Sequence, residues 1–459
     1  MRCRIIDVSD DATGSVAATV AALEARGVGT LIGTVVNAAG LTQVKVVPLN
    51  RVETFADHGL GTSPTWHVFA IDQTGIVFSD QTGVIGDRRV RVDLAGLRIL
   101  GDGLAWAPGA FFAQDGNQDP YCGRGVLQRV TQRLAAAGLT ARVGHEVEFV
   151  LVGPDGAQLP SALWAQYGLA GVLEFEGFVR DVMDAADAAG VAIEQFHPEY
   201  GANQFEFSLA PRDPVDAADQ LVLARIVISR VARRHGLRIS LSPVPFAGSV
   251  GSGAHQHFSL SHDGVPVFSG GSGARGMTAA GESAVAGLLA GLPGAQGVLC
   301  GSIVSGLRIQ PGSWSGANVC WGTENREAAV RFVSAASGNP YGANVEIKII
   351  DPSASPYLAS ATILGLALDG ITRELPLPPE VTVDPASLTE AQREHAGVVT
   401  LPAKQAEVLD ALRGSDVVRG ILGDAATDAV LGVRGYEQQN YGDLSDTELA
   451  EKFRLAWSV

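Results

Sequence analysis

The order of apolar and polar residues predicts helices and strands in irregular succession along the chain. Apolar residues spaced by about 3.6 positions, in runs that close near a glycine, favour helices. Such runs cover Val16–Ala25, Arg124–Ala137, Glu176–Ala189 and Pro214–His235. Runs rich in β-branched residues favour strands. They cover Thr30–Val36, Thr42–Val47, Val68–Val77, Val90–Leu100, Thr140–Val152, the two halves of Ile193–Leu209, and Leu237–Ser242.

Turn sequences and breaks organise these elements. Asn37-Ala38-Ala39-Gly40 between two β-rich runs predicts a hairpin. Pro108–Pro120 is expected to be a loop, and the uncharged run Ser283–Leu307 to be a buried helix, a break at Pro293-Gly294 and a second segment rather than a membrane span. After the connection Leu375–Pro385 the rest of the chain is largely helical. The first hundred or so residues are expected to form a small α+β domain.

Composition narrows the class of protein. The 459 residues suffice for two or three domains, or for one large domain with an appendage. Hydrophobic residues make up 46% of the chain, which suits a globular protein. Acidic residues outnumber basic ones by 49 to 33, giving a net charge of −16, which disfavours nucleic-acid binding.

The cysteines and the start of the chain favour a reducing compartment. No two of the four cysteines form a C-x-x-C pair; they are Cys3, Cys122, Cys300 and Cys320. The residues after Met1 are charged and lack the apolar core of a secretory signal. We therefore expect a cytoplasmic protein that does not span a membrane.

Two predicted strands carry unusual polar residues at alternate positions. Glu146 and Glu148 lie two residues apart in one strand. In the other strand, which follows a glycine-rich segment that starts at Gly248, His255, His257 and Ser259 are also spaced by two residues. Residues two apart on a strand share a face. Two carboxylates on one face repel each other unless a cation lies between them. A solvated strand face is the alternative, and it stays open at this point.

Several strands together supply candidates for one inner surface. The candidates are Glu146, Glu148, Glu199, Glu206, Glu346 and His255. Such a set suits hard divalent ions, Mg²⁺ or Mn²⁺, two or three of them. Arg308, Arg326 and Arg331 would bind anionic groups. Enzymes that transfer phosphoryl groups use metal ions together with arginines to neutralise the charge on the phosphate. The chain has neither the P-loop nor the Rossmann glycine pattern.

Several motifs resemble type I glutamine synthetase and follow that family's order. They read G-H-E-V-E-F, H-P-E-Y-G-A-N-Q-F-E, A-A-D-Q-L-V-L-A-R, G-S-G-A-H-Q-H-F-S-L, E-N-R-E-A-A-V-R and D-P-S-A-S-P-Y-L-A. The whole chain is most similar to the actinobacterial γ-glutamylpolyamine synthetase-like branch. The resemblance implies an N-terminal β-grasp domain (residues 1–105), a C-terminal catalytic domain (residues 106–459), and a homo-oligomer, a dodecamer, with active sites between neighbouring subunits. It also implies use of ATP and of two to three Mg²⁺ or Mn²⁺ ions per site.

The resemblance also assigns roles to residues. The ligands of the metal on the acceptor side correspond to Glu148, Glu199 and Glu206. Those of the metal on the nucleotide phosphates correspond to Glu146, His255 and Glu346. The positions that contact ATP correspond to Glu194, His257, Ser259 and Arg331. The positions that hold glutamate or the transferred phosphoryl group correspond to Gly251, Arg308 and Arg326.

The chain departs from the family pattern mainly on the acceptor side. The family's flap reads P-G-Y-E, whereas here it reads Pro311-Gly312-Ser313-Trp314, so that Trp314 replaces the glutamate that takes the proton from the nucleophile. The segment Gly59–Trp66, where the family carries an ammonium-binding aspartate, has no acid. A tryptophan can stabilise an alkylammonium by about 0.5–2 kcal/mol. The alternative is that another acid, such as Glu324, fills in.

Three further departures are milder. Val250-Gly251 replaces the usual Asn-Gly of the glutamate loop. Lys348 stands where the family has an arginine, which keeps the charge and loses the bidentate fork, and Asn344 replaces an arginine on the nucleotide side.

The sequence thus predicts an ATP-dependent γ-glutamyl–amine ligase that joins glutamate to a polyamine or another alkylamine, with Arg308, Arg326 and Trp314 at the reacting groups. A glutamine synthetase that uses ammonia, and a catalytically weak homologue with a binding role, are the alternatives.

Overall fold

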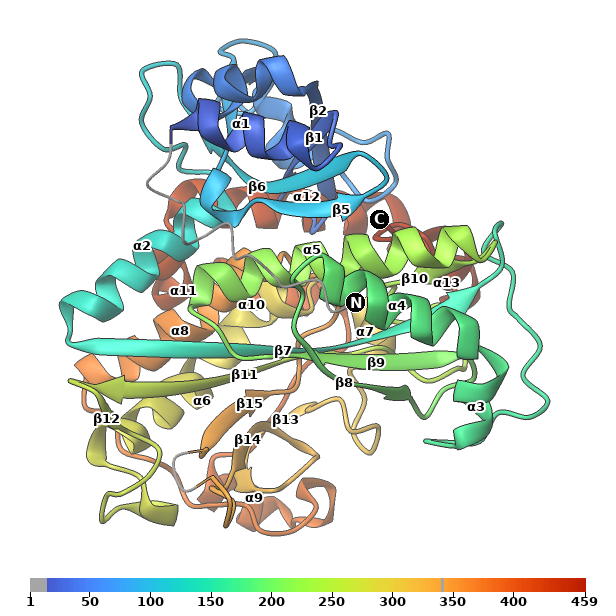
Figure 1. Cartoon of the computed structure of the whole chain (residues 1–459). Helices are drawn as coiled ribbons and strands as arrows, with labels where there is room; N and C mark the ends of the chain where they lie inside the picture. Colours follow the sequence, from blue (N-terminus) through green and yellow to red (C-terminus); the bar gives the residue numbers. More distant parts are fainter. Residues whose placement is uncertain (1–14, 340–341) are drawn as a thin grey trace.

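The computed structural model of the chain describes residues 15–339 and 342–459, arranged around two separate sheets (Figure 1). Cys3 and the charged start of the chain, on which the expectation of no secretory signal rests, lie outside these ranges. Both sheets are mainly antiparallel and are covered by helices. The expected α+β class is therefore confirmed.

The first sheet has the strand order β2-β1-β6-β4-β3, with β5 paired to β6. Its elements are α1 (Val16–Ala25), β1 (Thr30–Val36), β2 (Thr42–Pro48), β3 (Leu60–Thr62), β4 (Arg88–Val92), β5 (Arg98–Gly101) and β6 (Leu104–Phe112). β1 and β6 run parallel in the middle, and the other pairs are antiparallel. Leu23 of α1 is buried in the same apolar core as Leu31 and Val35 of β1. A parallel central pair with a helix on one side fits the expected β-grasp.

The second sheet carries the predicted site. Its strand order is β16-β13-β14-β15-β11-β7-β9-β8, with β10 paired to β7 and β12 to β11. The strands are β7 (Leu139–Val152), β8 (Ile193–Pro198), β9 (Gln204–Leu209), β10 (Arg238–Ser240), β11 (Ala254–His262), β12 (Val265–Pro266), β13 (Asn318–Thr323), β14 (Ala328–Val333), β15 (Asn344–Ile347) and β16 (Val399–Thr400).

The helices that follow the first sheet are α2 (Gly123–Ala136), α3 (Leu169–Glu174), α4 (Glu176–Ala188), α5 (Pro214–Arg234), α6 (Ala279–Leu299), α7 (Ser305–Arg308), α8 (Pro356–Thr372), α9 (Glu390–Ala396), α10 (Gln405–Arg413), α11 (Asp416–Leu422), α12 (Asp424–Tyr441) and α13 (Asp446–Phe453). Several of them cover one face of the second sheet. α2 and α5 contact β7, whose Val143, Val147 and Phe149 belong to the main apolar core (Figure 1). Because side chains alternate along a strand, Glu146 and Glu148 lie on the other face.

Most of the predicted elements are confirmed, and three predictions about the first half of the chain are wrong. Val68–Val77 is not a strand, because Asp72 accepts hydrogen bonds from the N–H groups of Thr74 and Gly75 and turns the chain back on itself. Val90–Leu100 divides into β4 and β5, because Asp93 caps a 3₁₀ turn between them.

Pro108–Pro120 is not entirely a loop, since its first residues belong to β6. Pro108 lies where β6 changes partner, from parallel pairing with β1 up to Pro108 to antiparallel pairing with β4 from Gly109 onward. A proline is tolerated at such a transition because it needs to donate no ladder hydrogen bond. The predicted domain boundary between residues 105 and 106 falls inside β6. We therefore propose that the N-terminal domain extends to the end of β6.

The predicted break at Pro293-Gly294 is also wrong, because α6 continues through it to Leu299. Close packing offsets the hydrogen bond lost at the proline. A Cβ atom on Gly287 would lie 2.3 Å from the carbonyl oxygen of Leu366, and one on Gly291 would lie 2.1 Å from a methyl group of Leu366. The close packing of α6 against α8 therefore holds α6 in a continuous helix through Pro293.

Three hydrogen bonds join turns beside the first sheet to the C-terminal part of the chain. The indole N–H of Trp457 donates to the carbonyl oxygen of Ala39, at 3.0 Å. Asp72 accepts hydrogen bonds from the hydroxyl groups of Tyr436 and Tyr441 on α12, at 2.9 and 2.5 Å. The turn that replaces the predicted strand thus holds the N-terminal sheet to α12.

The predictions about the cysteines and about membrane spans can be compared with the structure over residues 15–339 and 342–459 only. Cys122, Cys300 and Cys320 are buried thiols that form no disulfide there. None of the helices in residues 15–339 and 342–459 combines the length and the apolar character that crossing a bilayer requires.

Candidate active site

The strand register brings the predicted metal ligands onto one face of the second sheet. His255 of β11 is opposite Glu146 of β7, and Glu148 of β7 is opposite Glu206 of β9. On the other side of β11, His257 is opposite Glu346 of β15. Antiparallel neighbours have Cβ atoms about 4.5–5.5 Å apart, so these side chains form a continuous row across four strands.

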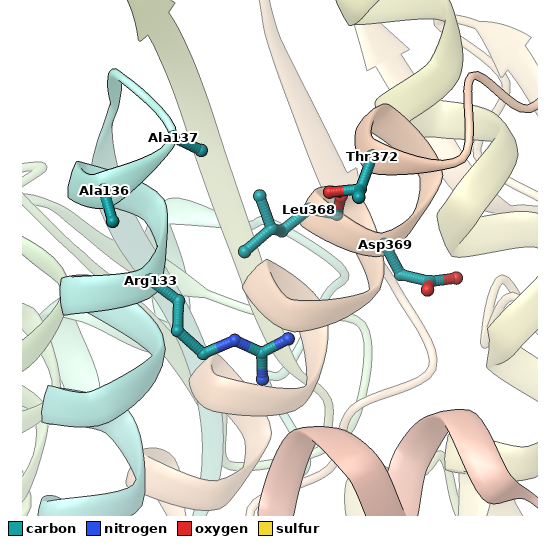
Figure 2. A pocket seen from close by; sticks show the side chains of 6 residues that line it. All are labelled: Arg133, Ala136, Ala137, Leu368, Asp369 and Thr372. Carbon is teal, nitrogen blue, oxygen red and sulfur yellow. The ribbon is translucent and has the colours of Figure 1, made fainter.

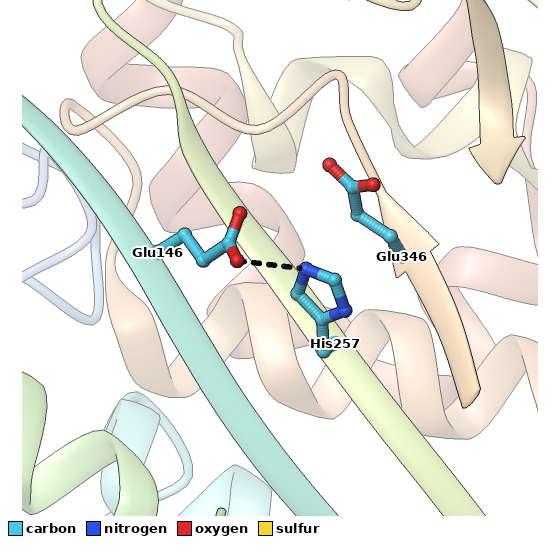
Figure 3. Close-up of side chains that lie close together, drawn as sticks. All are labelled: Glu146, His257 and Glu346. Carbon is cyan, nitrogen blue, oxygen red and sulfur yellow. Dashed lines mark ion pairs between the residues drawn. The ribbon is translucent and has the colours of Figure 1, made fainter. Parts of the chain in front are cut away.

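The first cluster in this row consists of Glu146, His257 and Glu346 (Figure 3). The imidazole Nε2 of His257 lies 3.5 Å from Glu146 Oε1, and its Nδ1 lies 2.8 Å from Asn344 Oδ1. Burial lowers the pKa of His257, but the bond to Glu146 and the charges of Glu346 and Glu146 outweigh burial and raise the pKa to about 9. Asn344, the departure on the nucleotide side, therefore orients His257.

The second cluster consists of Glu146, Glu206 and His255. His255 Nδ1 lies 3.4 Å from Glu346 Oε1 and 3.9 Å from Glu146 Oε2. Burial lowers the pKa of His255, and the cation of Lys348 lowers it further. A neutral imidazole between carboxylates is the form that binds a metal ion.

The third cluster adds a residue that sequence reasoning missed. His197 of β8 lies with Glu199 and Glu206, its Nε2 3.3 Å from Glu206 Oε1. Burial opposes the charged form, but the bond to Glu206 is the largest influence and raises the pKa of His197 to about 9. Its position two residues before Glu199 was the signal available in the sequence, since alternate residues share a face.

Tyr167 is a second residue that the sequence did not single out. Its ring lies 6.1 Å from the ring of His197, and its backbone has a left-handed φ of 55°. Burial raises the pKa of Tyr167 to about 12, with a further contribution from Glu199. Its phenol therefore stays protonated beside the third cluster. Nothing in the local sequence pattern marks this loop tyrosine.

Glu148 belongs to no such cluster, but its position is fixed. Its Oε2 accepts from the N–H of Gly253 at 2.9 Å and from the side chain of Gln204 at 3.1 Å. Burial raises the pKa of Glu148, and the charge of Glu199 raises it further, against the opposing charge of Arg308. Burial likewise raises the pKa of Glu206, as does the charge of Glu148.

Cationic side chains border the end of the row at β15. Arg331 donates to Glu346 at 2.9 Å and to Glu324 at 2.9 Å, and Lys348 Nζ lies 3.2 Å from Glu346 Oε1. Burial raises the pKa of Glu346, but Lys348 and the neighbouring histidines outweigh it and lower the pKa to about 2. Glu346 is therefore ionised and in place to bind a cation.

Arg308 shapes the glycine loop. It is buried and donates to the carbonyl oxygens of Ile349 and Lys348, both at 3.0 Å. A Cβ atom on Gly251 would lie 2.8 Å from the Arg308 side chain, and one on Gly253 would lie 2.5 Å from His255. Glycine is thus required at both positions by close approach. Val250, next to them, is 39% exposed.

The flap replaces the family's carboxylate with an exposed aromatic ring. Trp314 is 52% exposed and has a left-handed φ of 56°. Glu324 does not fill in for the missing flap acid, because its carboxylate accepts from Arg331 and from the N–H of Ser334. The carboxylate that does lie at the flap is Glu327, which accepts from the N–H of Trp314. Sequence reasoning missed Glu327.

Three residues to which the family resemblance assigns a role lie outside these three clusters. Glu194 lies exposed at an irregularity of β8, Arg326 is exposed beside Glu327, and Ser259 lies further along β11 than His257. Their roles towards ATP or a phosphoryl group stay predictions.

The side chains present fit divalent cations. Carboxylate oxygens and neutral imidazole are ligands of Mg²⁺ and Mn²⁺. Glu148, which is partly buried, and Glu206, which is buried, are opposed carboxylates with raised pKa values, and each would be stabilised by a cation between them. In the second cluster the carboxylates and the neutral imidazole of His255 offer ligand atoms within 4.8 Å of one another. In the first and third clusters the carboxylates are the ligands, because the pKa values of His257 and His197 are raised to about 9.

A separate hollow of about 360 Å³ lies between the ends of α2 and α8 (Figure 2). Its lining residues are Arg133, Ala136, Ala137, Leu368, Asp369 and Thr372. None of them belongs to the carboxylate row. The hollow is lined by few side chains that could take part in catalysis. We therefore take the row of carboxylates and imidazoles as the candidate active site.

An acidic row on an open sheet, bordered by arginines and a glycine loop, has the side chains that a metal-assisted enzyme acting on anionic groups would use. The family model described as "Glutamine synthetase, catalytic domain" matches residues 120–451. The chain belongs to the glutamine synthetase family, and it is a ligase that forms a carbon–nitrogen bond.

Individual relatives agree with this assignment. The chain is 40% identical over 440 residues to "Gamma-glutamylpolyamine synthetase GlnA3" of Streptomyces coelicolor, covering 94% of each protein. It is 32% identical over 305 residues to a "Glutamine synthetase" of Pyrococcus abyssi, covering 66% of this chain and 68% of that protein. A crystal structure of a "novel glutamine synthase homolog" superimposes with a TM-score of 0.84 at 30% identity, over 94% of this chain and 99% of that one. The resemblance to the actinobacterial branch is confirmed.

Proposed function

We propose that the chain is an ATP-dependent γ-glutamyl–amine ligase whose acceptor is a polyamine or another alkylamine. The observation that carries the proposal is the contrast between the two ends of the site. Every carboxylate and imidazole that the family resemblance assigns to metal binding is present in the chain, whereas the flap presents Trp314 in place of an acid. The name of the Streptomyces coelicolor relative supports the same acceptor class.

The proposed reaction has two steps. An oxygen of the glutamate γ-carboxylate attacks the γ-phosphorus of ATP, the bond to the bridging oxygen breaks, and ADP leaves. The amine nitrogen then attacks the acyl carbon of γ-glutamyl phosphate, a C–N bond forms, the C–O bond to phosphate breaks, and the amine loses a proton. Bound divalent ions supply charge neutralisation on the phosphate oxygens.

The residues of the chain bind and orient the substrates in this scheme. Arg331, held between Glu324 and Glu346, presents its guanidinium at the nucleotide side. Arg326, which forms no ion pair with any described residue, is available to the transferred phosphoryl group. The loop at Gly251, packed on Arg308, holds glutamate. Lys348 is committed to Glu346, and it contributes charge to this region.

The acceptor side favours an alkylamine over ammonia. Ammonium is a small, strongly hydrated cation that needs carboxylates around it before deprotonation. The half-exposed ring of Trp314 offers instead an apolar face that an alkylammonium can contact, worth about 0.5–2 kcal/mol. His197 and Tyr167 lie beside each other at the β8 end of the row.

Glutamine synthesis from ammonia is the second candidate. Several relatives carry the name "Glutamine synthetase" and share the catalytic-domain family. The absence of an acid at Trp314 and in Gly59–Trp66 weighs against it. A binding protein without turnover would not need the complete ligand row.

The assembly and the location of the protein stay predictions. The family resemblance predicts a dodecamer with active sites between subunits, which size-exclusion chromatography with light scattering would test. We also expect the protein in the cytoplasm.

The experiment that tests the proposal is a phosphate-release screen with ATP, Mg²⁺, glutamate and a panel of amines. Putrescine, spermidine and spermine should each support phosphate release together with a product of the mass of the γ-glutamyl amide. Equal or faster release with ammonium, and none with the polyamines, would overturn the acceptor assignment.

A further inference from the structure

Glu327 is a nearly buried carboxylate directly beneath the flap. Only 8% of its surface is exposed. Its Oε1 accepts from the backbone N–H of Trp314 at 2.9 Å, and its Oε2 accepts from the N–H of Gly312 at 3.3 Å. Among residues 15–339 and 342–459, no cationic side chain lies within ion-pair distance of it.

A buried carboxylate without a cation is costly unless donors satisfy its oxygens. Here the flap backbone provides both donors, and the flap is bent to do so. Gly312 has a φ of 80° and Trp314 a φ of 56°. A left-handed conformation is unfavourable for a bulky residue such as tryptophan and persists only where neighbouring contacts hold it. The carboxylate of Glu327 is one contact that holds it, and the hydroxyl groups of Ser313 and Ser315 add bonds to the carbonyl oxygen of Gln310 within the flap.

The backbone of Glu327 is anchored through Asn325 to the segment that contains Val381 and Val383. Its N–H donates to Asn325 Oδ1 at 3.1 Å, and the Asn325 side chain donates in turn to the carbonyl oxygens of Val381 and Val383, at 2.9 and 3.0 Å. Glu327 also directly follows Arg326, the residue assigned to the phosphoryl group. One side chain thus connects the flap to the segment that would hold the phosphate.

We infer that Glu327 is a positioning residue that latches the flap and places Trp314 over the acceptor site. The inference rests on the proposed function and extends it. With the latch in place, the amine reaches the acyl carbon of γ-glutamyl phosphate and water does not. Without it, water attacks the same carbon, the C–O bond to phosphate breaks, and glutamate and phosphate are released without a C–N bond.

Two substitutions separate the charge of the latch from its size. Glu327→Ala removes both acceptors. Glu327→Gln retains one acceptor for the N–H of Trp314, but its amide nitrogen cannot accept from Gly312. Glu394→Ala is the matched control, because Glu394 lies exposed on α9 and forms no ion pair with any described residue.

The catalytic readout is the ratio of phosphate released to γ-glutamyl amide formed. Hydrogen bonds to a charged group contribute enough that their loss changes an equilibrium roughly tenfold or more. We therefore expect Glu327→Ala to raise the ratio several-fold and to raise the KM for the amine about tenfold while the KM for ATP stays within about twofold. Glu327→Gln should fall between this variant and the wild type, and Glu394→Ala should match the wild type.

A second readout does not depend on the reaction. Chymotrypsin cleaves after aromatic residues, and the half-exposed Trp314 is a substrate once the flap is released. Mass spectrometry should show faster cleavage between Trp314 and Ser315 in Glu327→Ala, with other sites unchanged. If Glu327→Ala fails to fold, Glu327→Gln is assayed in the same way.

Unchanged flap cleavage together with an unchanged phosphate-to-amide ratio in the folded variant would overturn the latch. If no amine yields an amide with the wild type while flap cleavage still rises in the variant, the proposed function fails and the latch stands.

Discussion

Glu148 and Glu206 lie directly opposite each other on the antiparallel strands β7 and β9. Glu206 is buried and Glu148 is partly buried. Burial raises the pKa of each carboxyl group, and their mutual repulsion adds to the effect on Glu206. The folded chain therefore holds two carboxyl groups in a place where ionisation is unfavourable. A divalent cation between them would remove that cost, so that stability and metal binding are linked at this pair.

Replacing Glu148 with Gln should stabilise the metal-free protein. A carboxyl group whose pKa is raised by folding destabilises the native state as the pH rises above its unfolded value of about 4.5. The amide can still accept from Gly253 and Gln204, so those contacts survive. We expect a gain of about 1 kcal/mol in unfolding free energy at pH 8 and little change at pH 4. Urea unfolding at the two pH values measures it.

The same Glu148→Gln variant should respond less to metal. Mn²⁺ should raise the melting temperature of the wild type, and more at pH 8 than at pH 5, because the ligands must be ionised. In the variant this rise should be much smaller. Glu174→Gln, an exposed position on α3, is the control. A variant that is less stable without metal at pH 8 and retains the full response would contradict the account.

Glu199→Gln should abolish turnover while leaving the fold intact. Glu199 lies in the third cluster with His197 and Glu206, and its backbone is held by Gln204. Loss of one metal ligand removes several kcal/mol of charge stabilisation, so turnover should fall by roughly 10²-fold or more. Phosphate release with saturating substrates measures it, and circular dichroism checks the fold. A variant with wild-type turnover would exclude a metal at this cluster.

The acidic row could be predicted from the sequence because it depends on strands with period-two polar positions. Glu146 and Glu148 share a face of β7 by alternation alone, and His255 and His257 do so on β11. The register that places Glu148 opposite Glu206 is a tertiary property and needed the structure. His197 follows the same rule of alternation and could have been found.

Other features could not be predicted because they depend on contacts distant in sequence. The turn at Asp72 overrides the β propensity of Val68–Val77 through two local hydrogen bonds and two distant tyrosines. α6 passes through Pro293 because the glycines of its face fit against α8. A role for Glu327 becomes apparent only from the hydrogen bonds that its carboxylate oxygens accept from the flap.

Trp314 should set the preference between amines. Trp314→Ala removes the aromatic face and should reduce kcat/KM for spermidine by about 2- to 30-fold. Trp314→Glu restores a flap carboxylate and should shift the preference towards ammonium. Steady-state assays with both acceptors measure the ratio. An unchanged ratio of spermidine to ammonium activity in both variants would exclude this ring from the acceptor site.

Asp72 should contribute a pH-dependent part of the stability. Burial raises the pKa of Asp72, but hydrogen bonds from Tyr441, Gly75, Thr74 and Tyr436 outweigh it and lower the pKa from 3.8 to about 2. The ionised carboxylate of Asp72 therefore stabilises the folded protein above pH 3.8, and this stabilisation is lost as the pH falls through about 2. Asp72→Asn should cost about 1 kcal/mol at pH 7, allowing for partial exposure, and progressively less towards pH 3.

Denaturant unfolding of wild type and Asp72→Asn across this pH range provides the measurement. Asp87→Asn, an exposed aspartate in the same part of the chain, is the matched control. A difference between wild type and Asp72→Asn that does not change with pH would show that the ionised form is not the one stabilised.

The central claim is that this ligand row transfers glutamate to an alkylamine. Its most direct test is mass spectrometry of the product formed from ATP, Mg²⁺, glutamate and an equimolar mixture of ammonium and spermidine. The account predicts γ-glutamylspermidine as the main product, with one ADP formed per amide. Glutamine as the main product, with no γ-glutamylspermidine, would contradict it.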